Sequence, residues 1–462
     1  MDPRPGIRNQ NCRREFTTRA VGGRSDVGSR VMRHLPLALI VGLLAVPALR
    51  SAAPAAQDPG AFTNASLISA DGAGGFAVLP NATIVVNNGK IVATGPGQSL
   101  AFGADRLSVD LGGKFVVPGF VVAHAHVSDV NGLKPRAYTD ENSRRQLGVF
   151  ARYGITTVFS LGGEQAPAFA LREAQTASAP GRARIFVAGD VITGRTPGEA
   201  RAAVARVAAQ KPDLIKIRVD DNLGTATKMT PEVYRAVIDE AHTRGLKVAA
   251  HIFYLDDAKD LLRAGADFIA HSVRDKPIDD EFIFLMKARG VAYCPTLTRE
   301  ISVTVYESRP RFFDDPFFLR EADTDVMAQL LEPARQQAMK SSATAQRYKA
   351  GLKIAMANLK KAAANGVLIA MGTDSGAAPE RFEGYFEHLE MEMMAQAGMS
   401  PAAVLRASTS DAARSMQRQD IGTIAAGRWA DFVVLERNPL TNILNTRSIS
   451  SVWIAGRKIG AR

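Results

Sequence analysis

The sequence predicts an α/β protein, in which a (β/α)8 barrel of the TIM type carries a small β-sandwich domain built from both ends of the chain. Between residues 118 and 420, short runs rich in valine and isoleucine alternate with helical stretches, which is typical of parallel strands buried under helices. On either side, residues 57–117 and 421–462 contain short strand-like runs separated by turns. The length of 462 residues suits a barrel with a minor domain.

Eight apolar runs are candidates for the strands of the barrel. Each ends in polar residues or glycine and is followed by a stretch with helical character, and eight such units are the number that a TIM barrel contains. An open, doubly wound sheet is the alternative, but no G-x-G-x-x-G follows the first run. The runs are Phe120–His126, Ile155–Leu161, Ile185–Ala188, Leu214–Val219, Val248–Phe253, Phe268–Val273, Val291–Leu297 and Val367–Gly372.

One connection in the predicted barrel, residues 298–345, is unusually long. A connection of that length is often a lid or a binding loop, and a packed pair of peripheral helices is the alternative. The segment contains four phenylalanines, Phe312, Phe313, Phe317 and Phe318.

The two ends of the chain have the same strand-and-turn character. Residues 82–93 hold two β-branched runs around an Asn-Gly turn, which predicts a hairpin. Residues 431–435 and 451–454 are predicted strands near the C-terminus. Because an isolated pair of strands is only marginally stable, we expect both ends to fold into one small domain.

Residues 1–56 resemble a leader that contains a secretory signal peptide. An apolar run of 15 residues, 35–49, follows Met32-Arg33-His34 and precedes Ala53-Pro54-Ala55, a pattern typical of a cleaved signal that starts at Met32. The run is short for a bilayer span, so we expect no stable membrane insertion after cleavage and a periplasmic or secreted protein, with an uncleaved anchor as the alternative.

The overall charge of +11 is concentrated in this leader. Nine arginines and three acidic residues lie in residues 1–56, which leaves a net charge of +5 for the rest. No later block of basic residues is interleaved with aromatic residues, so nucleic acid is not an expected partner. The expected partner is a small-molecule substrate, and a homo-oligomer is possible.

Residues of types that can bind metals lie where several of the predicted strands end. Chemistry in a barrel takes place at the carboxyl ends of its strands, and four of the seven histidines lie there. Residues i and i+2 of a strand point the same way, so the first two can converge on one cation. Imidazole and carboxylate groups suit zinc or a similar divalent ion. The set is His124, His126, Lys216, His251, His271 and Asp374.

Lys216 is unusual because it lies between two isoleucines in a predicted buried strand. A charged amine buried there would be destabilised by several kcal/mol. Reaction with CO2 would convert the amine to an anionic carbamate that can bridge two cations.

Together these residues resemble the amidohydrolase superfamily, in its imidazolonepropionase-related, prolidase-like branch. The resemblance extends from about residue 60 to the C-terminus. It rests on Val-Pro-Gly-Phe before His124-Ala125-His126, on Leu-Ile-Lys-Ile around Lys216, on Gly-Thr-Asp-Ser around Asp374, and on the Gly-Thr-Ile to Ala-Asp-Phe-Val-Val stretch at 422–434.

The resemblance implies two divalent metal ions, with zinc as the expected metal. His124, His126 and Asp374 would hold one ion, His251 and His271 the other, and the carbamate on Lys216 would bridge them. Asp374 would also be the catalytic proton acceptor and donor.

The sequence departs from this branch at two places where substrate would lie. Residues 218–222 and 252–254 replace small, polar or glycine-containing loops, and this puts dipeptide specificity in doubt. Arg218, Tyr254 and Arg274 are candidates for binding a substrate carboxylate. His388 and His242 show no spacing that relates them to the metal set, so we expect them to be packing or surface residues.

The predicted function is hydrolysis of an amide-type C–N bond or an ester by a metal-bridging hydroxide. Dipeptides, N-acyl amino acids, carbamates and cyclic amides are the candidate substrates. One alternative is a mononuclear deaminase or imidazolone-type ring-opening hydrolase, although these usually lack the bridging lysine. The other is a non-catalytic scaffold, although such proteins typically lose metal ligands.

Overall fold

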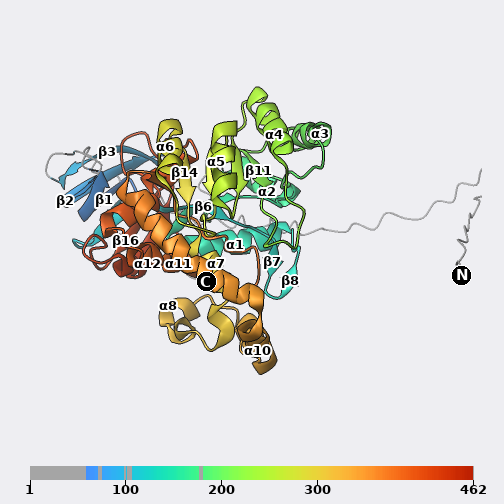
Figure 1. Cartoon of the computed structure of the whole chain (residues 1–462). Coiled ribbons are helices and arrows are strands. Elements are labelled where there is room, and N and C mark those ends of the chain that lie inside the picture. The colour runs from blue at the N-terminus through green and yellow to red at the C-terminus, as the bar shows by residue number, and fades with distance from the viewer. Residues whose placement is uncertain (1–58, 71–74, 98–99, 101–106, 176–180, 461–462) are drawn as a thin grey trace, which may run out of the picture. The chain divides into compact units, whose positions relative to one another are not determined.

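The computed structural model describes residues 59–70, 75–97, 100, 107–175 and 181–460 (Figure 1). The predicted signal segment lies outside these residues. The described residues make up one compact unit. None of the helices within the described ranges has both the length and the apolar character needed to cross a bilayer.

The eight predicted barrel strands all form, and they lie in two parallel sheets. The first sheet has the order β10-β9-β6 and the second the order β11-β12-β13-β14-β15. Their bounds are β6 Phe120–Ala125, β9 Ile155–Ser160, β10 Arg184–Val187, β11 Ile215–Arg218, β12 Val248–His251, β13 Phe268–Ala270, β14 Ala292–Cys294 and β15 Leu368–Ile369.

Parallel bridges connect the two sheets at both of their ends. Ala125 of β6 pairs with Ser375, just beyond β15, and Ile192, just beyond β10, pairs with Ile217 of β11. The N–H of Ala123 also donates to the carbonyl of Met371, at 2.8 Å. The strands therefore follow one another in chain order, and the last returns to the first. This order directs all eight carboxyl ends to one side.

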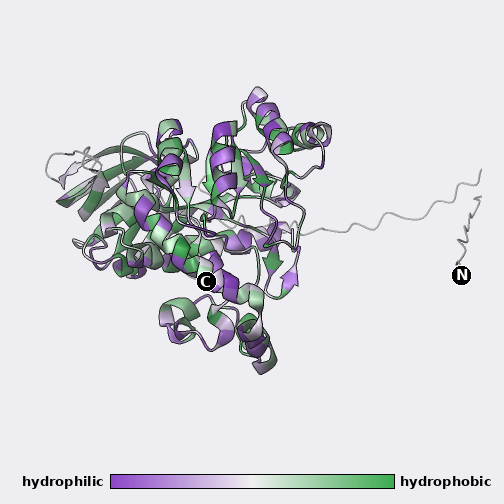
Figure 2. Ribbon diagram, in the orientation of Figure 1, coloured by the Kyte–Doolittle hydropathy of each residue, from purple (hydrophilic) through white to green (hydrophobic). Residues whose placement is uncertain are grey.

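Helices alternate with these strands, as the sequence predicts. In α4 the residues Val233, Val237 and Ile238 are buried, and Figure 2 shows polar and apolar residues on each of α3, α4 and α5. The helices are α1 Asp140–Arg152, α2 Ala166–Ala174, α3 Pro197–Ala208, α4 Pro231–Thr243, α5 Leu255–Ala264, α6 Asp280–Arg289, α11 Ala343–Ala364, α12 Tyr385–Gln396, α13 Pro401–Ala407 and α14 Ser410–Ser415.

The long connection after β14 is helical and packed. Phe313 and Phe318 are buried with ring centroids 5.4 Å apart, and Phe318 also contacts Tyr385 of α12. These contacts agree with the packed alternative to a lid. The elements are α7 Leu297–Ser302, η2 Val305–Glu307, η3 Arg311–Asp314, α8 Pro316–Leu319, α9 Thr324–Leu330 and α10 Pro333–Ser341.

Both chain ends contribute to one mixed sheet of eight strands (Figure 1). The predicted hairpin is confirmed, with Asn88 and Gly89 both at positive φ in its turn. Hydrogen bonds join all eight strands, and Phe62 of β1 packs against Phe432 and Trp453 in a core that both chain ends share. The strands are β1 Ala61–Ala70, β2 Phe76–Asn87, β3 Lys90–Pro96, β4 Ser108–Asp110, β5 Phe115–Pro118, β16 Phe432–Leu435, β17 Ile449–Ile454 and β18 Arg457–Lys458. Strands β7 Val130–Asn131 and β8 Lys134–Pro135 pair with each other in a separate two-stranded sheet.

A buried ion pair joins this mixed sheet to strand β10 of the first parallel sheet. The Nε of Arg184 in β10 lies 2.6 Å from the Oδ2 of Asp431, and both side chains are 3% exposed. Asp431 also accepts the N–H of Ala455 through Oδ1. Because both charges are buried and each is partnered, the pair fixes the β sheet against β10.

Candidate metal centre

His124 of β6, and His126 directly after that strand, converge on an aspartate that follows β15. The Nε2 atom of His124 lies 3.2 Å from the Oδ1 atom of Asp374, and the Nε2 atom of His126 lies 2.9 Å from the same oxygen. His124 is fully buried and Asp374 is 7% exposed. The structure thus brings these predicted ligands together, with one carboxylate oxygen between two imidazole nitrogens.

The remaining predicted ligands surround this pair. The Nζ atom of Lys216 lies 3.0 Å from the Nε2 atom of His124. The ring centroid of His271 lies 4.6 Å from that of His124 and 4.0 Å from that of His251. Burial is the main cause that lowers the pKa of Lys216, to about 8. All six predicted residues therefore belong to one continuous cluster at the carboxyl ends of the strands.

The backbone at the cluster is held in an uncommon conformation. His271, Thr296 and Asp374 have φ values of 73°, 46° and 61°, in the left-handed region that residues with a Cβ atom seldom adopt. Such conformations persist only where the surrounding structure enforces them, and they gather at functional sites. Their presence at two predicted ligands and at the hydrogen-bond partner of one of them supports a functional role.

Hydrogen bonds fix which nitrogen of His126 can bind a cation. Its Nδ1 atom lies 3.1 Å from the carbonyl oxygen of Gly162 and 3.1 Å from the Oδ2 atom of Asp129, and both oxygens are acceptors. Nδ1 therefore donates, which leaves Nε2 as the nitrogen that a metal ion can bind. Nε2 lies 2.9 Å from the Oδ1 atom of Asp374, so nitrogen and carboxylate oxygen face each other.

The carboxylates around His126 favour positive charge at its ring. Burial lowers the pKa of His126, but hydrogen bonds to Asp129 and Asp374 outweigh burial and raise the pKa to about 10. A proton on Nε2 would be donated to Asp374. A divalent ion can replace that proton, since metal ligands bind in their deprotonated form.

The distances between donor atoms also suit a metal ion. Ligands of a tetrahedral zinc ion with bonds of about 2.0 Å lie about 3.3 Å from one another. One ligand atom each from His124, His271 and Asp374 all lie within 4.8 Å of one another. The Nε2 atom of His271 is buried and has no hydrogen-bond partner among the described residues, while its Nδ1 atom lies 2.7 Å from the Oγ1 atom of Thr296. The donor set therefore fits divalent metal.

Two residues that sequence reasoning missed hold Asp374 in place. The Nη1 atom of Arg381 contacts the Oδ2 atom of Asp374, and Glu387 of α12 accepts hydrogen bonds from Thr373 and Ser375, both at 2.6 Å. Burial raises the pKa of Asp374, but Arg381 and the two histidines outweigh burial and hold the pKa well below its usual range. Asp374 is therefore held in its ionised form, with one oxygen facing the histidines.

Comparison with known proteins identifies the family. The profile of the amidohydrolase family matches residues 115–459, which include every residue of the cluster. The chain belongs to the amidohydrolase family.

Several known proteins are similar to this amidohydrolase. An uncharacterized protein of Mycobacterium tuberculosis is 28% identical over 196 residues, which are 40% of this chain and 51% of that protein. The enamidase of Eubacterium barkeri is 26% identical over 209 residues, 42% of this chain and 52% of the enzyme. The matches thus span about half the length of these curated relatives. A candidate prolidase from Bifidobacterium longum, of known structure, is 25% identical with a TM-score of 0.71, over 87% of this chain and 94% of that one.

Asp220 is a further site residue of this amidohydrolase, and sequence reasoning saw it only as part of a loop that departs from the family pattern. Its Oδ2 atom lies 3.0 Å from the Nε2 atom of His251, and its Oδ1 atom accepts from the Nε of Arg218 at 2.8 Å. Burial raises the pKa of Asp220, but His251 and Arg218 outweigh burial and hold it well below the usual range. An ionised Asp220 only accepts hydrogen bonds, so Nε2 of His251 carries the proton and Nδ1 is free for a metal.

Replacing Asp220 with alanine is expected to weaken metal binding at the His251 side by about 10- to 100-fold, because the imidazole loses the partner that fixes its orientation and tautomer. Asp220→Asn should weaken binding less, since the amide oxygen can still accept from Nε2. Competition with a chromophoric chelator measures the affinity. The matched control is Asp221→Ala, because Asp221 contacts Tyr254 instead of a histidine. Equal affinities for Asp220→Ala and this control would contradict the role of Asp220.

The three predicted substrate residues occupy different surroundings. Arg218 is exposed and Tyr254 is half-buried, and the hydroxyl of Tyr254 donates to Asp221 at 2.9 Å. Arg274 is enclosed, with Nη1 bonded to the carbonyls of Ile252 and Ser272 and Nε 3.1 Å from Glu300. We therefore retain Arg218 and Tyr254 as candidates and assign Arg274 to the interior of the protein.

The two remaining histidines lie in packing and surface positions. His388 is buried, and its Nε2 atom lies 2.8 Å from the carbonyl oxygen of Tyr153. His242 is exposed and its Nε2 atom lies 2.8 Å from the Oδ2 atom of Asp267. Neither contacts the predicted ligands.

Proposed function

We propose that this amidohydrolase is a metal-dependent hydrolase that cleaves an amide-type C–N bond or an ester with two divalent ions, which we expect to be zinc. His124, His126 and Asp374 would hold one ion, His251 and His271 the other, and a carboxylated Lys216 would lie between them. The observation that carries the proposal is the convergence of His124 Nε2 and His126 Nε2 on Asp374 Oδ1, at 3.2 Å and 2.9 Å, in a buried cluster. We also propose that the eight strands form a closed barrel.

The bound ions would polarise the substrate carbonyl and lower the pKa of a water molecule. Asp374 would accept the proton of the attacking water and then donate it to the leaving amine, acting first as a base and then as an acid. Arg381 orients the Asp374 carboxylate through its second oxygen. Burial of the cluster excludes bulk water and strengthens each of these interactions.

Lys216 would contribute as a carbamate. Its neutral amine attacks the carbon of CO2, a nitrogen–carbon bond forms, and one proton leaves the nitrogen. The product has one negative charge and two oxygens, so it can contact two cations where a single amine nitrogen cannot. The alternative of a mononuclear deaminase or ring-opening hydrolase requires no such modification.

The substrate class includes dipeptides, N-acyl amino acids, carbamates, cyclic amides and esters. Similar folds occur in a Xaa-Pro dipeptidase with a TM-score of 0.69 and 22% identity, over 86% of this chain and 98% of that one. A similar fold occurs also in molinate hydrolase, with a TM-score of 0.66 and 21% identity, over 86% of this chain and 94% of that one. These neighbours motivate a screen across C–N bonds of several kinds.

The experiment that tests the function is a screen of zinc-loaded protein against these substrate classes, before and after treatment with a chelator. We expect hydrolysis that is lost on chelation and restored by divalent metal, together with two metal ions per chain by elemental analysis. Full activity after chelation would contradict metal dependence. Full activity at a metal content well below two ions per chain would contradict only the binuclear form of the proposal and would leave metal dependence intact.

A further inference from the structure

Helix α12 carries a glutamate, Glu390, to which the proposed mechanism assigns no role. Its side chain is fully buried, as is that of Glu387 one turn earlier on the same face of the helix. Burial raises the pKa of Glu390 to about 7. A carboxylate in such a place is destabilised unless hydrogen bonds compensate for the water that it has lost, so its partners explain why it is tolerated there.

The partners of Glu390 are the first groups of another helix. Its Oε1 atom accepts the N–H of Leu297 at 2.8 Å, and its Oε2 atom accepts the N–H and the hydroxyl of Thr298 at 2.7 Å and 2.8 Å. These two N–H groups begin α7, and the first N–H groups of a helix have no acceptor within the helix. Glu390 therefore caps α7 from outside.

This contact frees the side chain that would normally cap α7. A threonine directly before a helix typically accepts one of the first N–H groups through its own hydroxyl. Thr296 occupies that position, but its side chain forms no such bond and its backbone is left-handed, with a φ of 46°. Its Oγ1 atom lies instead 2.7 Å from the Nδ1 atom of His271. Because Glu390 accepts the N–H groups at the start of α7, the hydroxyl of Thr296 is available to His271.

The bond to Thr296 determines which nitrogen of His271 faces the cluster. Burial lowers the pKa of His271 well below its usual value, so the ring is neutral and one of its nitrogens carries the proton. When that proton lies on Nδ1 and is donated to Thr296, the lone pair lies on Nε2, which is buried and has no hydrogen-bond partner among the described residues. A fixed tautomer with a free Nε2 atom suits a metal ligand.

Helix α12 also links this segment to the aspartate of the cluster. The hydroxyl of Thr298, which Glu390 binds, lies 3.3 Å from the carbonyl oxygen of Thr373, the residue before Asp374. Glu387 accepts a hydrogen bond from the side chain of the same Thr373 at 2.6 Å. One helix thus contacts the segment that follows β14 and the segment that follows β15, and so sets their relative position.

We propose that Glu390 is a positioning residue of the metal centre, which holds the start of α7 so that Thr296 fixes the tautomer and orientation of His271. The inference rests on the proposed function, because it gives His271 the role of a metal ligand. Glu390 bonds to none of the six predicted ligands and acts through Thr296. Removing Glu390 or the hydroxyl of Thr296 is therefore expected to change the same property of His271.

Nuclear magnetic resonance of the full chain, labelled at its histidine nitrogens, reads the tautomer of His271 before any metal is added. In the wild-type protein we expect the proton on Nδ1, and in Glu390→Ala we expect a mixture of both tautomers. His388 is an internal control, because it lies on α12 two residues before Glu390 and contacts the carbonyl of Tyr153 instead. Its resonances should stay unchanged. A change at His388 as well would indicate a general distortion of α12 and would overturn the specific role.

Competition of the same full chain with a chromophoric chelator measures its affinity for zinc. We expect Glu390→Ala to weaken zinc binding about 10-fold, the lower end of the effect typical of groups that orient a ligand. Glu390→Gln keeps one oxygen as an acceptor and should retain part of the affinity. Thr296→Val removes the hydroxyl and should weaken binding to a similar degree. The double variant should be no weaker than either single variant, since both changes break one connection.

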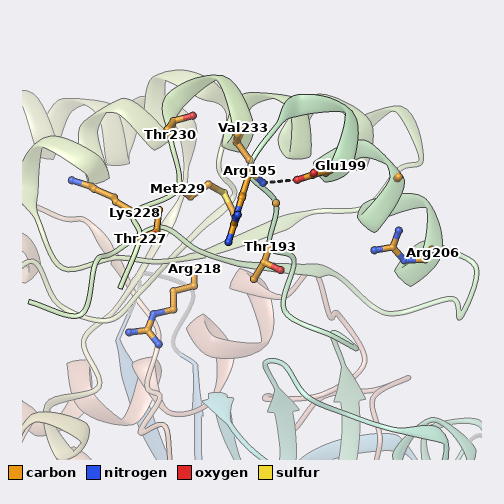
Figure 3. Close-up of a pocket in the computed structure, with 12 residues that line it drawn as sticks. Thr193, Arg195, Glu199, Arg206, Arg218, Thr227, Lys228, Met229, Thr230 and Val233 are labelled. Carbon is orange, nitrogen blue, oxygen red and sulfur yellow. Dashed lines mark hydrogen bonds between the residues drawn. The ribbon is translucent and has the colours of Figure 1, made fainter. Parts of the chain in front are cut away.

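The matched control is Glu199→Ala. Glu199 is also a helical glutamate that accepts a backbone N–H, that of Arg195 at 2.9 Å, but it belongs to α3. It lines a cavity between α3 and α4 together with Arg218, and none of the six predicted ligands lines that cavity (Figure 3). We expect Glu199→Ala to match the wild-type protein in its zinc affinity and in the tautomer of His271.

Equal behaviour of Glu390→Ala and the control would overturn the proposal. Additive effects of the changes at Glu390 and Thr296 would overturn it as well, because Glu390 would then act by a route other than Thr296. Failure of the proposed function appears separately, as hydrolysis that is unaffected by chelation, because the tautomer is read without metal or substrate.

Discussion

Replacing Asp374 with asparagine is expected to abolish turnover and to leave the fold intact. The amide is a poorer metal ligand than the carboxylate and cannot accept and return a proton. General acid–base catalysis typically contributes about 100-fold or more, and the loss of a ligand adds to this effect. The oxygen of the substituted amide could still accept a hydrogen bond from Arg381, so we expect the loop to keep its conformation.

Steady-state rates, metal content and circular dichroism test this prediction together. Asp325→Asn is the matched control, since Asp325 is an exposed carboxylate on α9 and makes no side-chain contact with the cluster. We expect the control to match the wild-type protein in rate and metal content. An Asp374→Asn protein that keeps more than about a tenth of the wild-type rate would contradict the role of Asp374 in proton transfer.

The strands and the residues of the histidine–aspartate cluster could be predicted from the sequence because their signals are local. A run such as Phe120–His126 shows in its own residues that it is a buried strand, and it carries His124 and His126 two positions apart. Parallel strands place their carboxyl ends on one side, so Lys216 and Asp374 could be assigned to the same site without knowledge of any contact.

The residues that position the side chains of this cluster could not be predicted in the same way. Thr296 and His271 lie in contact and both adopt positive φ, and no feature of their sequence indicates that conformation. Arg381 lies seven positions after Asp374, and the path of the loop that brings them into contact depends on tertiary packing. Asp220 gave a faint signal as an acidic residue two positions past a strand end, in a loop that departs from the family pattern.

Burial separates residues of the same type that look alike in sequence. Arg218 ends β11 and Arg274 lies four residues beyond β13, each directly after an apolar residue, yet Arg218 lines a cavity and Arg274 is fully enclosed. The pairing of β5 with β16 likewise joins segments more than 300 residues apart, so its register depends on the completed fold. Sequence patterns indicate that such strands exist but carry no information on which residues pair.

Replacing Lys216 with alanine is expected to remove one metal ion and most of the activity. Lys216 is 3% exposed and its Nζ atom lies 3.0 Å from the Nε2 atom of His124, so a protonated amine would repel any cation bound there. A neutral amine has one lone pair and can contact only one ion. The carbamate resolves both difficulties, because it supplies a negative charge and two oxygens, and the metals neutralise it in turn.

Rescue experiments separate the carbamate from a purely structural role of the lysine. In Lys216→Ala, propionate at high concentration should restore part of the metal content and part of the activity, by placing a carboxylate in the vacated space. Lys216→Arg should not respond, because its larger cation fills that space and cannot react with CO2 in the same way. Elemental analysis of both variants with and without propionate gives a readout that is independent of the substrate.

The chemical state of Lys216 in the metal-loaded protein decides between the two forms of the mechanism. We expect a carbamate in the electron density of crystals of the native protein loaded with metal and CO2, and metal occupancy that falls when CO2 is removed. An unmodified amine beside a fully occupied metal site would contradict the binuclear mechanism. The four histidines and Asp374 would then serve a single ion, as the mononuclear alternative requires, and Lys216→Ala would keep its metal and most of its turnover.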